Sequence, residues 1–218
     1  MNMFFRITLD YDTHANEIVN QIPEKHFVSK TDTFLDPAFA GGQLLKAVAK
    51  RLKKYGHSIE NIRSRLFGYE ENIGYIKHSD NHITCMIANL CVVKDYKKLS
   101  KSHKKINVVL QNAPYLKGTW FKFLENSLNL NPDVIVQISP DGTGNYSNRS
   151  DKIEKVFLEN GVQYYEDCTS SFPSVNSGKI IWAMLEPGKP PRPNVLEDNS
   201  VIGNIVKKVV SHNGTKVE

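Results

Sequence analysis

Long apolar segments and pairable cysteines are both scarce in this chain of 218 residues. No stretch approaches the roughly 18 continuous apolar residues that indicate a membrane-spanning helix, so we expect no membrane partner. The N-terminus has a short apolar patch but lacks the long hydrophobic segment of a secretion signal. The three cysteines, Cys85, Cys91 and Cys168, are odd in number and lack the spacing of metal ligands. These absences predict a reduced, cytoplasmic protein without a metal centre.

An excess of acidic residues is lacking as well. The chain has 28 lysines and arginines against 23 aspartates and glutamates, a formal net charge of +5 and an isoelectric point near 9.0. This balance modestly favours a polyanionic partner. Hydrophobic residues make up 40% of the chain, which is enough for a buried core and excludes wholesale disorder. The length suits one domain of ordinary size with a tail.

Apolar periodicity and turn residues predict strands that alternate with helices. The expected strands cover residues 33–36, 65–70, 90–94, 106–112, 133–139, 162–168 and 178–185. The expected helices cover residues 14–22, 42–55, a short segment after Ser58, 73–79, 119–130 and 151–161. This alternation indicates an α/β fold with a mainly parallel sheet covered on both faces.

Polar residues follow four consecutive strands of this predicted sheet. They are Asp36-Pro37-Ala38-Phe39-Ala40-Gly41-Gly42 after the first strand, Glu70 after the second, Asp95 after the third and Asn112-Ala113-Pro114-Tyr115 after the fourth. Ligands of such sheets bind at the carboxyl ends of the strands. A tight glycine turn before a helix can also form an anion or nucleotide pocket. The four sites together predict one shared ligand pocket.

In this order, the motifs resemble those of the S-adenosylmethionine-dependent DNA adenine-amino methyltransferases. That family has a D-P-A-x-G-x-G turn, an acidic residue after the second strand, Asp after the third and N-P-P-Y after the fourth. The similarity runs from about residue 10 to about residue 187. It implies a Rossmann-like class I methyltransferase fold, with a mainly parallel seven-stranded sheet, helices on both faces and an antiparallel closing hairpin. Residues 1–187 would form the catalytic domain, and residues 188–218 a C-terminal extension or tail.

The resemblance implies S-adenosylmethionine as the cofactor. Its expected binding residues are Asp36, Pro37, Ala38, Ala40, Gly42, Glu70 and Asp95. Glu70 would accept hydrogen bonds from the ribose hydroxyls, and Asp95 from the adenine amino group. Asp36 would orient the turn near the methionine amino group. The structural alternatives are a capping carboxylate for Asp36 and for Glu70. Ala40 replaces the first glycine of the family turn and lacks the conformational freedom of glycine.

The expected catalytic residues are Asn112, Ala113, Pro114 and Tyr115. An exocyclic amino nitrogen is a poor nucleophile because its lone pair is delocalised into the ring. The side-chain oxygen of Asn112 and the carbonyl of Ala113 could bind both amino hydrogens and favour a more nucleophilic nitrogen. Pro114 would stiffen the turn, and Tyr115 would stack on a flipped base. Ala113 replaces the usual proline but keeps the carbonyl. An ordinary Asn-x-Pro turn is the structural alternative.

By resemblance, the chain would methylate the exocyclic amino group of adenine in DNA, in a restriction-modification or phage setting. Its expected partners are DNA, RNA as an alternative nucleic acid, and a separate specificity subunit. The lysine-rich run over residues 94–105 could contact phosphates. Methylation of RNA or of a protein glutamine is one alternative function. A non-catalytic, methyltransferase-like subunit that binds nucleic acid is another.

Overall fold

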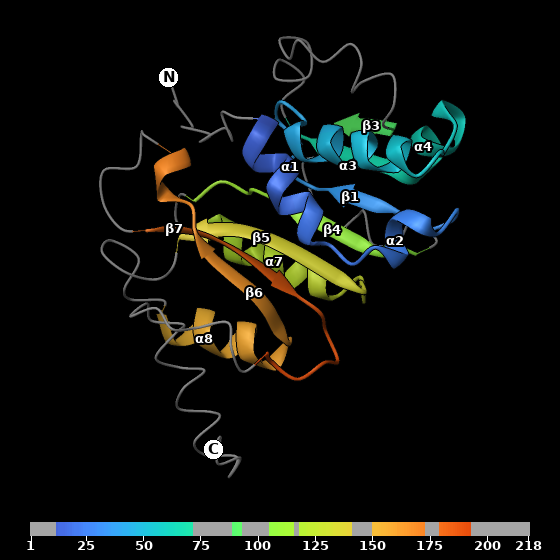
Figure 1. Cartoon of the computed structure of the whole chain (residues 1–218). Coiled ribbons are helices and arrows are strands. Elements are labelled where there is room, and N and C mark those ends of the chain that lie inside the picture. The colour runs from blue at the N-terminus through green and yellow to red at the C-terminus, as the bar shows by residue number, and fades with distance from the viewer. Residues whose placement is uncertain are drawn as a thin grey trace, which may run out of the picture.

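The computed structural model describes residues 12–71, 89–92, 105–115, 118–140, 150–172 and 179–192 (Figure 1). The helices in these residues are α1 (Asp12–Gln21), α2 (Lys25–Val28), α3 (Gln43–Lys54), α4 (Ile59–Arg65), α7 (Thr119–Leu128), α8 (Ser150–Glu159) and the 3-10 helix η4 (Thr169–Ser171). The strands are β1 (Phe34–Asp36), β2 (Leu66–Glu70), β3 (Asn89–Val92), β4 (Val108–Gln111), β5 (Val134–Pro140), β6 (Val162–Asp167) and β7 (Ile180–Leu185). None of these helices is long and apolar enough to cross a membrane.

Seven strands form one sheet in the order β3-β2-β1-β4-β5-β7-β6. Strands β1 to β5 pair in parallel with their neighbours, and β7 is antiparallel to both β5 and β6. The chain proceeds outward from β1 in one direction and then returns to continue from β4 in the other. The boundary between β1 and β4 is therefore the topological switch point, where ligands of such sheets bind.

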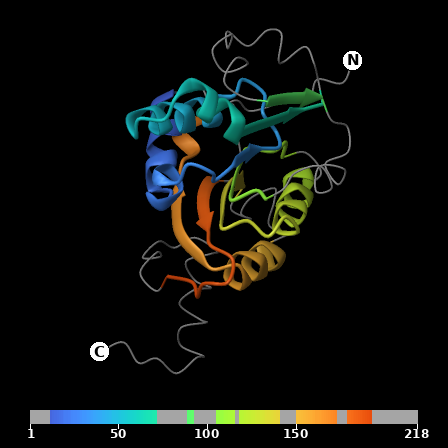
Figure 2. The same cartoon turned by 90° about the vertical axis from the view of Figure 1, so that its right-hand side faces the viewer.

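Two helical layers cover the sheet. Figure 2 shows α1, α3 and α4 on one side of the strands and α7 and α8 on the other. Strands covered on both faces are built from continuous apolar runs, and β5 is buried at every position. On α3, the residues that face the core recur at helical spacing: Leu44, Leu45, Val48 and Leu52. This packing holds the strand ends in a fixed register.

The structure confirms the α/β architecture, the mainly parallel seven-stranded sheet and the antiparallel hairpin predicted from the sequence. The sequence pattern does not predict α2 or η4, because four and three residues are too few to show a helical period. Strand β3 starts at Asn89, one residue before the predicted strand. The helix expected over residues 73–79 lies outside the described residues.

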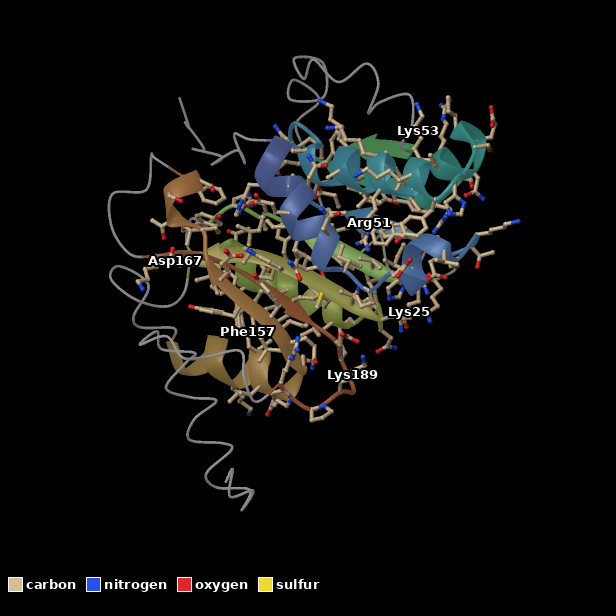
Figure 3. All side chains as sticks on the ribbon, in the orientation of Figure 1. Lys25, Arg51, Lys53, Phe157, Asp167 and Lys189 are labelled. Atoms are coloured by element: carbon tan, nitrogen blue, oxygen red, sulfur yellow. The ribbon has the colours of Figure 1, made fainter. Side chains whose placement is uncertain are left out.

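The predicted tail begins as a segment that contacts β6. In the described part of it, the N–H of Arg192 donates to the carbonyl of Val162 at 2.9 Å. The side-chain Nε2 of Gln163 donates to the carbonyl of Pro190 at 2.7 Å. Lys189, labelled in Figure 3, lies in this segment. The described start of the predicted C-terminal extension therefore lies against β6.

Arginine side chains make hydrogen bonds and a ring contact at the edge of the sheet where the parallel strands begin. The guanidinium of Arg65 is 2% exposed and donates to the carbonyls of Asp32, at 2.6 Å, and His26, at 2.9 Å. Burial lowers the pKa of Arg65, and the nearby Asp32 partly opposes that shift. Arg51, labelled in Figure 3, lies over the ring of Phe27, with Cζ 3.8 Å from the ring centroid. These contacts join α2 to α3, to Arg65 at the end of α4 and, through Arg65, to the segment that precedes β1.

Candidate active site

The candidate site lies at the carboxyl ends of the parallel strands, on both sides of the switch point. Leu35 pairs with Val109 across the boundary between β1 and β4, and Asp36 pairs with Gly68 of β2. The turn after β1 therefore stands between the end of β2 and the segment that follows β4. The structure brings these three predicted segments to one edge. The predicted residue Asp95 lies outside the described residues.

Backbone hydrogen bonds shape the turn after β1. The N–H of Gly42 donates to the carbonyl of Phe39 at 2.7 Å, and the N–H of Phe39 donates to the carbonyl of Tyr69 at 2.9 Å. The N–H of Ala38 donates to Oδ1 of Asp36 at 3.0 Å. These bonds tie the turn to itself and to β2. The contact of Asp36 with Ala38 is the kind of local bond that a capping carboxylate makes.

Left-handed backbone occurs at two positions of this turn. Ala40 has φ of 43° and Gly42 has φ of 73°. Glycine adopts this conformation freely, whereas alanine does so at a cost of roughly 1–2 kcal/mol. A Cβ at Gly42 would lie 2.3 Å from the ring of Phe39, so a side chain does not fit there. Ala40, which stands in place of the first glycine of the family turn, thus has the left-handed conformation that a glycine would adopt more easily.

Glu70 closes the turn from the end of β2. Its side chain is 3% exposed, and its Oε2 accepts a hydrogen bond from the N–H of Ala40 at 2.9 Å. A carboxylate removed from water needs such donors. This contact joins residues that are distant in the sequence, and no local pattern of residue types indicates it. The predicted ribose ligand is thus also a structural partner of the strained Ala40.

The Asn-Ala-Pro-Tyr segment is anchored on the start of α7. The N–H of Trp120 donates to the carbonyl of Pro114 at 3.0 Å, and the N–H of Gly118 donates to the carbonyl of Tyr115 at 3.2 Å. The hydroxyl of Tyr115 donates to Oδ1 of Asn112 at 2.9 Å. Ala113 and Tyr115 are buried and Asn112 is half-buried. The segment is therefore a fixed turn that leaves part of Asn112 accessible.

Three buried polar side chains are hydrogen-bonded to one another next to this segment. Nε2 of Gln111 donates to Oε1 of Gln137 at 2.6 Å, and Oγ of Ser127 donates to Oε1 of Gln111 at 2.8 Å. Nε2 of Gln137 donates to the carbonyl of Ile138 at 2.7 Å. All three side chains are fully buried. They link β4, β5 and α7 beneath the candidate site. Glutamine in a strand suggests an exposed position, which is why the sequence does not reveal this support.

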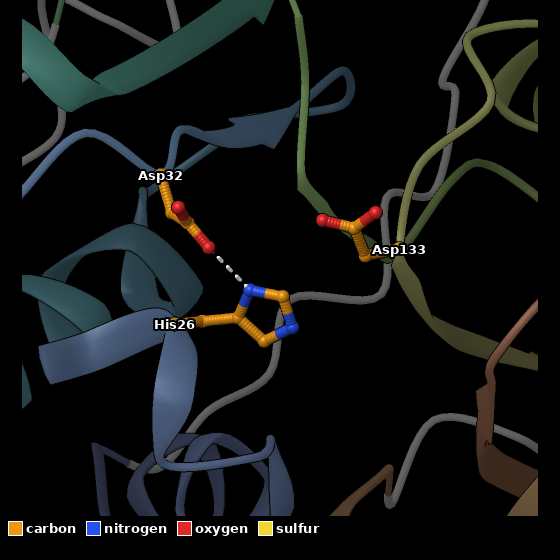
Figure 4. Close-up of side chains that lie close together, drawn as sticks. All are labelled: His26, Asp32 and Asp133. Carbon is orange, nitrogen blue, oxygen red and sulfur yellow. Dashed lines mark hydrogen bonds and ion pairs between the residues drawn. The ribbon is translucent and has the colours of Figure 1, made fainter. Parts of the chain in front are cut away.

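Three potential metal ligands meet at the opposite edge of the sheet, as Figure 4 shows. Nδ1 of the buried His26 lies 2.7 Å from Oδ2 of Asp32, and Asp133 lies beside the same imidazole. Asp133 already accepts hydrogen bonds from Asn107 at 2.8 Å and from Lys105 at 3.1 Å. The other ring nitrogen, Nε2, points at neither carboxylate (Figure 4). These contacts describe a structural cluster that joins α2 to the starts of β1, β4 and β5.

Lys105, the last residue of the lysine-rich run, lies away from the candidate site. It is exposed and pairs with Asp133 where β4 and β5 begin. This is the edge opposite the candidate site, so a role of Lys105 in holding DNA at that site is not supported. The strand β4 itself separates Lys105 from Asn112. The rest of the run, residues 94–104, lies outside the described residues.

Sequence comparison alone identifies no relative: no protein-family model matches the chain, and no curated protein matches it significantly. Solved structures do match its fold. The type I restriction enzyme EcoKI M protein is similar with a TM-score of 0.61 and 12% identity, over 83% of this chain and 44% of that one. A modification subunit of a putative type I restriction enzyme from Vibrio vulnificus YJ016 has a TM-score of 0.57 and 14% identity, over 95% and 53%.

A putative class I S-adenosylmethionine-dependent methyltransferase from Listeria monocytogenes is similar as well, with a TM-score of 0.59 and 16% identity, over 98% of this chain and 72% of that one. The chain has the class I S-adenosylmethionine-dependent methyltransferase fold. At identities this low, structural similarity establishes the fold alone. The activity must be argued from the site. The chain spans about half the length of the two restriction-enzyme proteins, at 44% and 53%.

Proposed function

We propose that this chain transfers a methyl group from S-adenosylmethionine to the exocyclic amino group of adenine in DNA. The observation that carries the proposal is the meeting of two motifs at one switch point. One is the left-handed turn closed by Glu70, and the other is the anchored Asn-Ala-Pro-Tyr segment. In a class I methyltransferase fold, this edge of the sheet is where a cofactor and a target group would come together.

The residues proposed to hold the cofactor are Asp36, Pro37, Ala38, Ala40, Gly42 and Glu70, with Asp95 outside the described residues. Their chemistry fits a nucleoside, because the carboxylate of Glu70, which accepts from the N–H of Ala40 in the turn, can also accept from ribose hydroxyls. When bound, the cofactor supplies an electrophilic methyl group on a positively charged sulfur. The chain itself binds and orients that group.

Asn112 and Ala113 are proposed to bind the target amino group. Two acceptors, Oδ1 of Asn112 and the carbonyl of Ala113, would take both amino hydrogens and favour a tetrahedral, more nucleophilic nitrogen. The carbonyl of Pro114 accepts from the N–H of Trp120 at 3.0 Å, which anchors the main chain next to Ala113 before the substrate arrives. Tyr115 is proposed to stack on the flipped base. Its ring is buried in this structure, so stacking requires that the base displace part of what covers it.

DNA is the proposed substrate because of the adenine-type motif, with Asn112 at its start, and because of the basic composition. A separate specificity subunit is a further proposed partner. One similar structure is itself described as the modification subunit of a restriction enzyme. The proposed setting is the cytoplasm of a bacterial cell or a phage-infected host.

The test is to incubate the purified chain with methyl-labelled S-adenosylmethionine and with DNA, RNA or protein. We expect label on the amino group of adenine in DNA. Asn112→Ala should lower transfer by at least about a hundredfold, by analogy with the loss of one stabilising group in an active site. Cofactor binding by calorimetry should stay unchanged, because Asn112 acts on the target. Asn129→Ala, at the exposed end of α7, is the matched control.

The other outcomes separate the alternatives. Label in RNA or in a protein glutamine, without label in DNA, would move the function to one of those substrates. Saturating S-adenosylmethionine without any heat of binding would contradict an enzymatic role. That result would favour a non-catalytic subunit that keeps the fold and binds nucleic acid or a partner.

A further inference from the structure

Two buried polar groups beside the candidate site have no hydrogen-bond partner among the described residues. They are the hydroxyl Oγ of Ser139 and the indole Nε1 of Trp120, and both residues are 0% exposed. Taking such a group out of water without a partner costs free energy, so native proteins rarely leave one unpaired. A ligand that supplies the missing partner is one explanation where the group adjoins a binding site.

Ser139 lies at the carboxyl end of β5, next to the Asn-Ala-Pro-Tyr segment. Strand β5 pairs in parallel with β4, and the last pair in their register joins Gln111 to Gln137. Ser139 follows two residues later, at the level where the Asn-Ala-Pro-Tyr segment leaves β4. Alternate residues of a strand share a face, so Ser139 is on the same side of the sheet as Gln137. Gln137 is hydrogen-bonded there, whereas the Ser139 hydroxyl, nearer the candidate site, is not.

Trp120 reaches the same end of the sheet from α7. Its N–H donates to the carbonyl of Pro114 at 3.0 Å, which places it against the Asn-Ala-Pro-Tyr segment. Trp120 and Ser127 both belong to the buried face of α7 and are about two helical turns apart. Ser127 donates to Gln111 on the sheet. Because α7 begins at the edge where β4 ends, Trp120 lies on the same side of the sheet as Ser139 and closer to the candidate site than Ser127.

We infer that Ser139 and Trp120 donate hydrogen bonds to ring nitrogens of the target base. The inference rests on the proposed function. An indole N–H can only donate, and a hydroxyl can donate as well. The ring nitrogens of adenine accept, and they adjoin the amino group that Asn112 and Ala113 are proposed to bind. Enzymes that act on an extruded base read it by such hydrogen bonds. The base must displace what covers both residues, as it must at Tyr115.

Ser139→Ala tests the inference through stability and substrate binding together. Alanine removes a hydroxyl that has no partner in the free chain, so the urea midpoint should stay at or above the wild-type value. The KM for DNA should rise about tenfold, because one hydrogen bond to the substrate is lost. The kcat and the Kd for S-adenosylmethionine should change less than about twofold, since the lost bond forms in both the bound and the reacting complex.

Ser127→Ala is the matched control for stability. It makes the same substitution at a buried serine on the same side of the sheet, but its hydroxyl donates to Oε1 of Gln111 at 2.8 Å. Its urea midpoint should therefore fall. An equal fall in Ser139→Ala would mean that the Ser139 hydroxyl has a partner in the free chain, and this would overturn the inference. A wild-type KM in Ser139→Ala would overturn it as well.

Trp120→Phe is compared with Trp182→Phe, because both indoles are buried and only Trp182 has a partner for its Nε1. That nitrogen donates to Oε2 of Glu166 at 2.9 Å on the antiparallel hairpin. We expect Trp120→Phe to raise the KM for DNA about tenfold and Trp182→Phe to leave it at the wild-type value. Equal KM values in the two variants would overturn the assignment of Trp120. If Trp120→Phe does not fold, Ser139→Ala and the analogues of adenine still decide the inference.

Analogues of adenine identify the atoms that are bound. The probes are DNA molecules made with three deaza-adenines, each with a carbon in place of one ring nitrogen and with the amino group retained. At least one analogue should raise the KM of the wild-type chain about tenfold and that of Ser139→Ala less than about twofold, because the bond is already lost in the variant. Equal effects of every analogue on the two chains would overturn the inference and leave the proposed function standing. A wild-type chain that methylates no adenine would overturn the proposed function and this inference with it.

Discussion

The two edges of the parallel sheet are held together by different chemistry. Where the strands begin, Arg65 donates to two backbone carbonyls, and Nδ1 of His26 lies 2.7 Å from Oδ2 of Asp32. Where the strands end, the described contacts hold the turns that follow β1 and β4. Glu70 accepts from the N–H of Ala40, and Tyr115 donates to Asn112. That second edge also contains the left-handed alanine.

This difference separates stability from function. Arg65, Asp32 and Asp133 are hydrogen-bonded at the first edge, so they contribute to folding, whereas Nε2 of the buried His26 has no partner among the described residues. The second edge keeps a sparsely populated backbone conformation, which persists in proteins where the surroundings impose it and often where a ligand binds. Substitutions at the first edge should therefore change stability and leave binding intact. Substitutions at the second should change binding or turnover relatively more.

The largest effect on stability is expected for Arg65→Ala. It removes a buried guanidinium and both of its bonds to the carbonyls of His26 and Asp32, and we expect a loss of about 3 kcal/mol in the free energy of unfolding. Urea denaturation measures this loss. Lys53→Ala, which removes an exposed cation of α3 (labelled in Figure 3), should change stability by less than about 0.5 kcal/mol.

The same variant tests the separation of the two edges. At a temperature where Arg65→Ala is fully folded, its affinity for S-adenosylmethionine should equal that of the wild-type chain, as measured by calorimetry. Weaker binding by the folded variant would show that the first edge, where the parallel strands begin, affects the conformation of the proposed cofactor turn. The comparison between the edges would then be wrong.

A smaller effect, of opposite sign, is expected for Ala40→Gly. Glycine relieves roughly 1–2 kcal/mol of left-handed strain and loses roughly 0.5–1 kcal/mol to the greater freedom of the unfolded chain. We therefore expect a net stabilisation of up to about 1.5 kcal/mol in thermal or urea unfolding. Ala38→Gly is the control, because Ala38 is not among the left-handed residues and should lose stability. Equal losses in both variants would exclude strain at Ala40.

The sequence predicts the sheet and both motifs of the candidate site because those signals are local. Apolar periodicity marks the strands and helices. The glycines of the turn and the proline of the Asn-Ala-Pro-Tyr segment mark the breaks between them. Of the residues expected to surround the switch point, Asp36, Glu70 and Asn112 lie at neighbouring strand ends, and Asp95 lies outside the described residues. Local composition and the order of the motifs were sufficient for that much.

The supporting contacts could not be predicted because they are non-local or depend on the local backbone. Arg65 precedes an apolar strand and gives no sign that its guanidinium turns back to the carbonyl of Asp32. The bond between Ala40 and Glu70 requires the left-handed turn, which a sequence with alanine at that position does not indicate. Gln111 is polar in composition but fully buried. Such contacts appear only when distant segments are placed in register.

The smallest expected effect concerns Asp133 and the pH dependence of stability. Partial burial would raise the pKa of Asp133, but the hydrogen bonds from Asn107 and Lys105 outweigh it and hold the pKa below its ordinary value. The folded state therefore binds the proton more weakly than the unfolded state does. The resulting stabilisation is complete above the unfolded pKa of about 4 and is lost as the pH falls through the folded pKa.

Asp133→Asn removes this titration with little change in shape. We expect it to lower stability at pH 7 by less than about 1 kcal/mol, since water and salt screen a partly exposed pair. We also expect stability to fall less steeply than in the wild-type chain below about pH 4. Urea denaturation across this range is the measurement. High salt should weaken the contribution of the exposed Lys105 more than that of the half-buried Asn107. If the free energy of unfolding of the two chains depends on pH in the same way, Asp133 does not stabilise the first edge through its charge. The contacts of His26, Asp32 and Arg65 would then maintain that edge without it.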